Sequence, residues 1–257
     1  MTDLIKLLLF EIIKVLKQPI HYFFVFIIVA PTMILQAGMS SYLEKPMAIN
    51  DAVFIPMQTT INTILPFIIL FFSANIFASE IKYKTIRSLL SHNSRGKVFI
   101  AKTCTVAIYV GLLLTLIFVT SFLGYLLLNN FKIVRPGCGI DLFVWHFIGM
   151  LSLTYLSLFA VASFGILLSC FFNNNISAIS IGIGSYILIE CIKTQLRIDK
   201  YIITSYFEKP MNMFTAVIEG YHSFCSQDII NFTVIVLCWV TIPLALSFFI
   251  FRNKDIQ

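Results

Sequence analysis

Residues 80–102 read EIKYKTIRSLLSHNSRGKVFIAK, and this stretch lies between two long apolar runs. It holds six of the chain's eighteen Lys and Arg residues but only one carboxylate, Glu80. It cannot cross a bilayer, because each Lys or Arg at the centre of a spanning helix costs about 2.5–3.5 kcal/mol. We therefore predict a cytoplasmic hinge between two membrane helices. Its alternating apolar and basic positions suit contact with another protein.

The composition around the hinge is that of an integral membrane protein. Apolar residues make up 59% of the 257 residues, charged residues make up 12%, and the mean hydropathy is +0.93. Soluble domains average about half apolar and a quarter charged. The net charge of +6 would suggest nucleic acid for a soluble chain. In a membrane chain the positive-inside rule explains it, so we expect no nucleic-acid partner.

Apolar segments long enough to cross the bilayer follow one another along the chain. Before them, residues 1–18 form a predicted amphipathic helix in the headgroup plane, with Leu4, Leu8 and Ile12 on its apolar face. Glu11 lies one turn from Lys14, where an ion pair is easy. We predict a single all-α transmembrane domain over residues 1–257, with spans at 20–36, 53–79, 103–128, 142–172, 176–192 and 229–251.

The distribution of charge sets the expected topology. Eleven Lys and Arg residues fall in the amino-terminal segment, the hinge and the tail, against seven in the opposite loops. The richer side is predicted to be cytoplasmic, which makes this a multi-pass protein of the cell membrane with both termini inside. Residues 173–175 then form a tight internal hairpin turn.

The long segment 193–228 is predicted to be external, although its composition is unlike that of a loop. Apolar residues recur among polar ones, which indicates two short amphipathic or re-entrant helices separated by Pro210. Cys138 and Cys225 both fall in predicted external loops, so either a disulfide or two free thiols is compatible with the sequence.

Sequence signatures of catalysis are missing. The nearest approach to a phosphate-binding loop, at residues 95–98, has no hydroxyl residue for magnesium, and Ser91 stands at the first glycine position. The four histidines are scattered without metal-ligand spacing. We expect no catalytic residue, no metal site and no cofactor in this chain.

The hinge resembles that of the ATP-binding-cassette (ABC) type 2 exporter permeases. In that family a Glu closes the second span, and a Gly-Thr pair, a Leu-Leu pair, a Pro-x-x-Arg turn and a Lys that opens the third span follow it. Two positions depart from the pattern, since Lys84 replaces Gly and Asn93 replaces Pro. The matching residues are Glu80, Thr85, Leu89, Leu90, Arg95 and Lys102.

The resemblance implies a coupling helix that fits a cleft in a separate ATPase subunit, which would bind the ATP and Mg²⁺. An apolar edge and flanking cations suit this role, because the cations can meet an acidic rim. Two simpler interpretations stay open: the cations anchor the chain to anionic lipid, and Glu80 pairs with Lys84. The candidate coupling residues are Glu80, Lys82, Thr85, Ile86, Arg87, Leu89, Leu90, Arg95 and Lys102.

Polar residues within the spans give further candidates. Glu190 could serve transport or could pair with Lys193. Polar residues of the second span could line a substrate path or bond to neighbouring helices, with Gln58, Thr59 and Asn62 as the candidates. Small residues of the fifth span favour close helix packing, within the chain or between two copies. These are Ala178, Ser180, Gly182 and Gly184.

The sequence thus predicts a permease subunit without its own ATPase, working with a second copy or a similar permease. Export of a peptide, toxin or lipophilic drug follows from the resemblance, and export of an antimicrobial peptide for self-protection is the specific hypothesis. An ion-gradient transporter would want paired acidic residues at mid-span, which the spans lack. A membrane scaffold or sensor is the other alternative.

Overall fold

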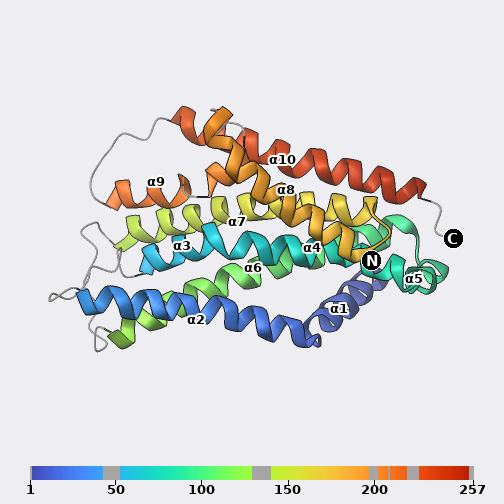
Figure 1. Ribbon diagram of the computed structural model, residues 1–257, viewed down its shortest axis with the longest axis horizontal. Coiled ribbons are helices and arrows are strands. Elements are labelled where there is room, and N and C mark those ends of the chain that lie inside the picture. Colours follow the sequence, from blue (N-terminus) through green and yellow to red (C-terminus); the bar gives the residue numbers. More distant parts are fainter. Residues whose placement is uncertain are drawn as a thin grey trace.

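The computed structural model describes residues 2–42, 53–128, 140–196, 202–207, 209–218 and 226–254. In these ranges the regular structure is helical, and six helices are long and apolar enough to cross a membrane. They run side by side along the long axis of the molecule, and both termini lie at one end of the bundle together with the short helix α5 (Figure 1). The predicted fold class is confirmed.

The first half of the described chain contains the helices that position the hinge. The amphipathic helix is α1 (Thr2–Leu16), and α2 (Pro19–Tyr42) is the first span. The second span comprises α3 (Ile55–Thr63) and α4 (Leu65–Lys82). The short helix α5 (Ile86–His92) leads into α6 (Arg95–Leu128), the third span.

The second half contains the centre of the bundle. Helix α7 (Ile140–Phe171) packs against α4, α6, α8, α9 and α10. Helix α8 (Asn175–Leu196) follows the short turn that the sequence predicts, and α10 (Ser226–Asn253) is the last span. The segment between them includes a 3-10 helix, η3 (Ile203–Tyr206), and α9 (Lys209–Ile218).

Two prolines decide local helix boundaries. The second span is interrupted at Ile64, two residues before Pro66. Proline has no N–H for the carbonyl four residues earlier, and the Tyr186 hydroxyl lies 3.5 Å from that oxygen, on Asn62. Pro210 does not separate two helices but lies in the first turn of α9, where a missing N–H costs nothing.

Helices α4 and α7 approach each other closely. A Cβ at Gly165 would overlap the Ser73 hydroxyl and lie 3.3 Å from the backbone nitrogen of Ala74. One turn further along α7, the Ser169 hydroxyl accepts hydrogen bonds from the backbone N–H groups of Phe77 and Ala78, at 2.8 and 2.9 Å. These contacts fix the half of α4 that leads to the hinge.

The small residues of α8 divide between two faces. Ala178 packs against Ala74 and Ala78 of α4, and a Cβ at Gly182 would lie 3.2 Å from Leu168 of α7. Ser180 is exposed, and no atom lies within 4 Å of a Cβ at Gly184. Ala178 and Gly182 therefore serve packing within the chain. Ser180 and Gly184 lie on a part of the α8 surface that no other described element covers.

Candidate coupling site

The hinge begins where α4 stops, at a residue with left-handed backbone geometry. Lys84 has φ 59°, and its N–H donates to the Ile81 carbonyl at 3.2 Å. This conformation closes many helices and is usually occupied by glycine, because a side chain there costs about 1–2 kcal/mol. The Lys84 departure from the family pattern is therefore accommodated without loss of the turn.

Helix α5 lies at the surface with its charged side outward. Arg87, Ser88 and the preceding Thr85 are exposed, whereas Ile86 is fully buried. Leu89 and Leu90 are half-buried and pack against the hydrophobic core. The predicted apolar edge therefore faces mainly into the protein. Asn93 ends the helix with extended geometry at φ −135°, and its amide lies 3.3 Å from the Leu89 carbonyl oxygen, to which it donates.

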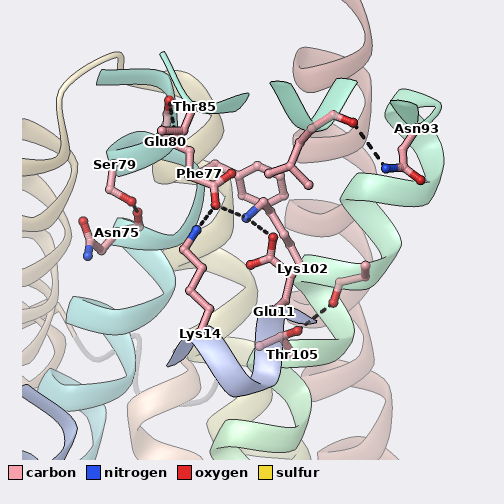
Figure 2. A network of polar contacts seen from close by, with 12 residues as sticks. Glu11, Lys14, Asn75, Phe77, Ser79, Glu80, Thr85, Asn93, Lys102 and Thr105 are labelled. Carbon is pink, nitrogen blue, oxygen red and sulfur yellow. Dashed lines mark hydrogen bonds and ion pairs between the residues drawn. The ribbon is translucent and has the colours of Figure 1, made fainter. Parts of the chain in front are cut away.

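Beneath α5 lies a chain of four alternating charges, which we call the buried charge quartet: Glu11, Lys102, Glu80 and Lys14 (Figure 2). The Lys102 ammonium lies 3.1 Å from a Glu11 oxygen and 2.8 Å from a Glu80 oxygen. Glu80 also accepts a hydrogen bond from Lys14. The side chain of Lys102 is 1% exposed and those of both carboxylates at most 4%, while that of Lys14 is 38% exposed.

The quartet joins three helices that are distant in sequence. Glu11 and Lys14 come from α1, Glu80 comes from the last turn of α4, and Lys102 comes from the second turn of α6. Two positive and two negative charges alternate, so each buried ion has an opposite neighbour. Desolvating an unpaired ion costs several kcal/mol. The three helix ends are therefore held together as one unit.

The structure corrects both predicted ion pairs of this region. Glu80 does not pair with Lys84, which is exposed, and Glu11 does not pair with Lys14. Lys102 and Glu80 lie inside the protein instead of on a docking surface. The burial of Glu11 could have been predicted from the sequence, since it stands on the same helical face as Leu7 and Val15, which are buried too.

Two other cations of this end bind the ends of helices. The Arg95 guanidinium donates to the carbonyls of Arg252 and Lys254 at 2.6 and 2.9 Å. The Lys254 ammonium donates to the Cys170 carbonyl of α7 at 2.7 Å. Burial lowers the pKa of the Lys254 ammonium below its usual value. Cations are stabilised at helix carboxyl ends by unpaired carbonyls and the helix dipole.

Four cations of the hinge stay at the surface: Lys82, Lys84, Arg87 and Lys97. Lys82 is exposed and its ammonium lies 3.3 Å from the Asn175 side-chain oxygen at the start of α8. Together with Arg87 it gives this surface a positive charge close to α5.

The candidates within the spans lie far from α5 in the fold. The Glu190 carboxylate and the Lys193 ammonium are 2.5 Å apart, which confirms the predicted pair. The Gln58 amide donates to Asn212 of α9 at 3.4 Å, and Thr59 bonds to the Ile55 carbonyl of its own helix. Hydrogen bonding between and within helices thus explains these polar groups.

Two other predictions concern sites that need cysteine or metal. Cys138 and Cys225 lie outside the described residues. Among the residues that the structure does describe, no three His, Cys, Asp or Glu side chains gather in a group that could hold a metal ion.

A bundle of six helices long and apolar enough to cross a membrane, with a short surface helix between the second and third, is the architecture of a polytopic membrane protein. Residues 7–189 match the family described as ABC-2 family transporter protein, and the chain belongs to this family. The match extends from α1 into α8 and includes α5 and the whole quartet. Membership makes the chain a membrane permease of an ABC exporter, with an ABC ATPase as its implied partner. No curated protein matches the chain.

Proposed function

We propose that α5 is the coupling helix of this permease and that it binds a separate ATPase subunit, which carries the ATP and Mg²⁺. Two permease copies, or this chain and a similar one, join two such subunits in the cell membrane, with both termini in the cytoplasm. Closure of the ATPase subunits on ATP then pushes α5 and changes the arrangement of the spans.

The observation that carries this proposal is the position of α5 over the buried charge quartet. The exposed Arg87 and Lys82 offer positive charge to an acidic rim on the partner. The buried Ile86 attaches α5 to the bundle, and the quartet ties the adjoining ends of α4 and α6 to α1. A push on α5 therefore reaches three helices at once. Glu80 and Lys102 position α5 and do not contact the ATPase themselves.

For the substrate we propose an antimicrobial peptide, exported to protect the producing cell. The support is the family together with the compactness of the chain, in which the six spans occupy most of the described residues. Its test compares the peptide concentration that inhibits cells expressing the permease with its ATPase against cells expressing either one alone. Protection that needs both subunits supports export, whereas protection by the permease alone favours a scaffold or sensor.

The coupling assignment is tested with the permease and its ATPase co-expressed and purified in mild detergent. Arg87→Glu should reduce recovery of the ATPase at least several-fold, because it reverses a charge on the exposed side of α5. Lys97→Glu is the matched control, since Lys97 is also exposed but belongs to α6. Equal recovery with both variants contradicts the assignment. Active transport without any ATPase would favour the ion-gradient alternative.

A further inference from the structure

The buried charge quartet reaches only part of the bundle. Its members come from α1, α4 and α6, and none comes from α7 or α10. Yet α10 packs along α7, and both helices finish at the end of the bundle where α5 lies (Figure 1). A movement of α5 that changes the arrangement of the whole bundle therefore needs a second connection, from α6 to these two helices.

Arg95 makes the first part of this connection. It is the first residue of α6, and only Asn93 and Ser94 separate it from α5. Its guanidinium donates to the carbonyl oxygens of Arg252 at 2.6 Å and Lys254 at 2.9 Å. The last carbonyls of a helix have no donor within that helix, and hydrogen bonds from a cation are about twice as strong as neutral ones. The start of α6 is therefore attached to the carboxyl end of α10.

Lys254 makes the second part. Its ammonium donates to the Cys170 carbonyl at 2.7 Å and lies 3.4 Å from the carbonyl oxygen of Phe171, the last residue of α7. It thus supplies a donor to carbonyls at the carboxyl end of a second helix. Because the Lys254 carbonyl also accepts from Arg95, this one residue takes part in both contacts. We call Arg95 and Lys254 the carboxyl-end clasp.

Aromatic rings pack between the same helices beside the clasp. Phe77 of α4 and Phe251 of α10 are fully buried, with ring centroids 5.0 Å apart. The rings of Phe99 of α6 and Phe248 of α10 are 5.3 Å apart. Packed side chains allow helices to slide past one another by small steps, as in shear motion. Helix-end carbonyls point along the helix axis, so short hydrogen bonds to them resist this axial sliding in a way that ring packing does not.

We propose that Arg95 and Lys254 are positioning residues for coupling, which carry the movement of α5 into α10 and α7 while the quartet carries it into α1 and α4. This inference rests on the proposed coupling function. It gives Arg95 a role that acts through other helices, in place of direct contact with the ATPase.

The test follows the helix ends in the permease–ATPase complex reconstituted in nanodiscs. Pairs of spin labels are attached to introduced cysteines, in a background without the six native cysteines. Pulsed electron paramagnetic resonance measures their separation without nucleotide and with a non-hydrolysable ATP analogue. Ile100→Cys with Phe249→Cys reports on α6 against α10, and Phe171→Cys with Phe249→Cys reports on α7 against α10. All three native side chains are exposed.

Each cation should have its own effect on these distances. With the native clasp neither distance should change on nucleotide binding, because the three helix ends move together. With Arg95→Met the α6–α10 distance should shift by about 1–5 Å on nucleotide binding, whereas the α7–α10 distance should stay constant. With Lys254→Met the α7–α10 distance should shift instead.

Three further variants are the controls. Arg95→Lys and Lys254→Arg restore a cation and should restore constant distances. Arg252→Gln should behave as the wild type, because the clasp uses the backbone carbonyl of Arg252 and its side chain is exposed.

Recovery of the ATPase with each variant separates this inference from the coupling assignment. Equal recovery throughout, with distances that no substitution makes dependent on nucleotide, would overturn the inference and leave the docking of α5 intact. A distance that changes with nucleotide in the native clasp would also overturn it. Loss of the ATPase with Arg95→Met alone would return Arg95 to the docking surface. Failure of the unsubstituted permease to bind the ATPase would overturn both proposals.

Discussion

At the scale of single residues, Lys84 carries a strained conformation in the hinge. It has φ 59°, where a side chain is disfavoured and glycine is not. Lys84→Gly should therefore raise the free energy of unfolding by about 0.5–1 kcal/mol. Denaturant unfolding in mixed micelles measures this change.

The control for that substitution lies two residues earlier. Lys82 is the last residue of α4, so Lys82→Gly should destabilise the protein, by up to about 1 kcal/mol. If both substitutions shifted stability in the same direction, the left-handed geometry of residue 84 would not be the cause.

Lys102 is the residue on which the buried charge quartet depends most. Lys102→Met should cost about 3–5 kcal/mol, because it leaves Glu11 without a cation in a buried site. The double variant Glu11→Gln/Lys102→Met keeps the Glu80–Lys14 pair and should be less destabilised than Lys102→Met alone. Additive losses in this double-mutant cycle would contradict a coupled network.

Sequence reasoning could identify these ions but not their partners. Glu80 and Lys102 stood out because they match the positions that close the second span and open the third in the hinge pattern of the family. Pairing by local helical spacing suggested Lys84 for Glu80 and Lys14 for Glu11. The actual hydrogen-bonded partners are separated by 66 residues for Lys14 and Glu80, and by 91 for Glu11 and Lys102. Only the packing of α1 against α6 brings the second pair together.

At the scale of elements, the contact between α4 and α7 is the tightest constraint on the hinge. Gly165→Ala should destabilise the protein by about 1–3 kcal/mol, since the new methyl meets both the Ser73 hydroxyl and α4 backbone. Gly149→Ala on the same helix has open space around its Cβ and should be neutral or slightly stabilising. Thermal unfolding in detergent compares the two variants. Equal effects would mean that helix propensity, not contact with α4, decides the result.

Hydropathy located every span but could not locate every helix end. The third span was predicted to begin at residue 103, whereas α6 begins at Arg95. Its first two turns are too polar for a membrane pattern. In the fold the charge of Lys102 is balanced by the carboxylates of the quartet, and Arg95 is hydrogen-bonded to backbone carbonyls at the end of α10. The division of the short helices between the fifth and last spans was misread because Pro210 opens a helix as readily as it ends one.

At the scale of the whole molecule, the two ends of the bundle should face opposite sides of the membrane. Tyr83 next to α5 is 67% exposed, and Trp145 near the start of α7 is 75% exposed. In a background without the six native cysteines, Tyr83→Cys should react with an impermeant maleimide only after the cells are opened, because the positive-inside rule places α5 in the cytoplasm. Trp145→Cys is the control and should react in intact cells.

The opposite labelling pattern would contradict this orientation. Reaction of Tyr83→Cys in intact cells would place α5 outside and remove the basis for an ATPase contact. The sequence alone supports this orientation through charge bias, and the structure adds that both termini share one end with α5 (Figure 1).

The order in which the buried charge quartet is synthesised has a consequence for biogenesis. Glu11, Lys14 and Glu80 leave the ribosome before Lys102, so a chain that has just completed α4 holds one more negative than positive charge in this group. A carboxylate without a cation next to lipid disfavours stable packing of α1 against α4. The arrival of α6 supplies the missing ammonium, and the charges of the quartet are balanced from that point. We expect a chain arrested between these two points to be less stably packed than a chain extended through α6, because one of its buried carboxylates lacks a cation.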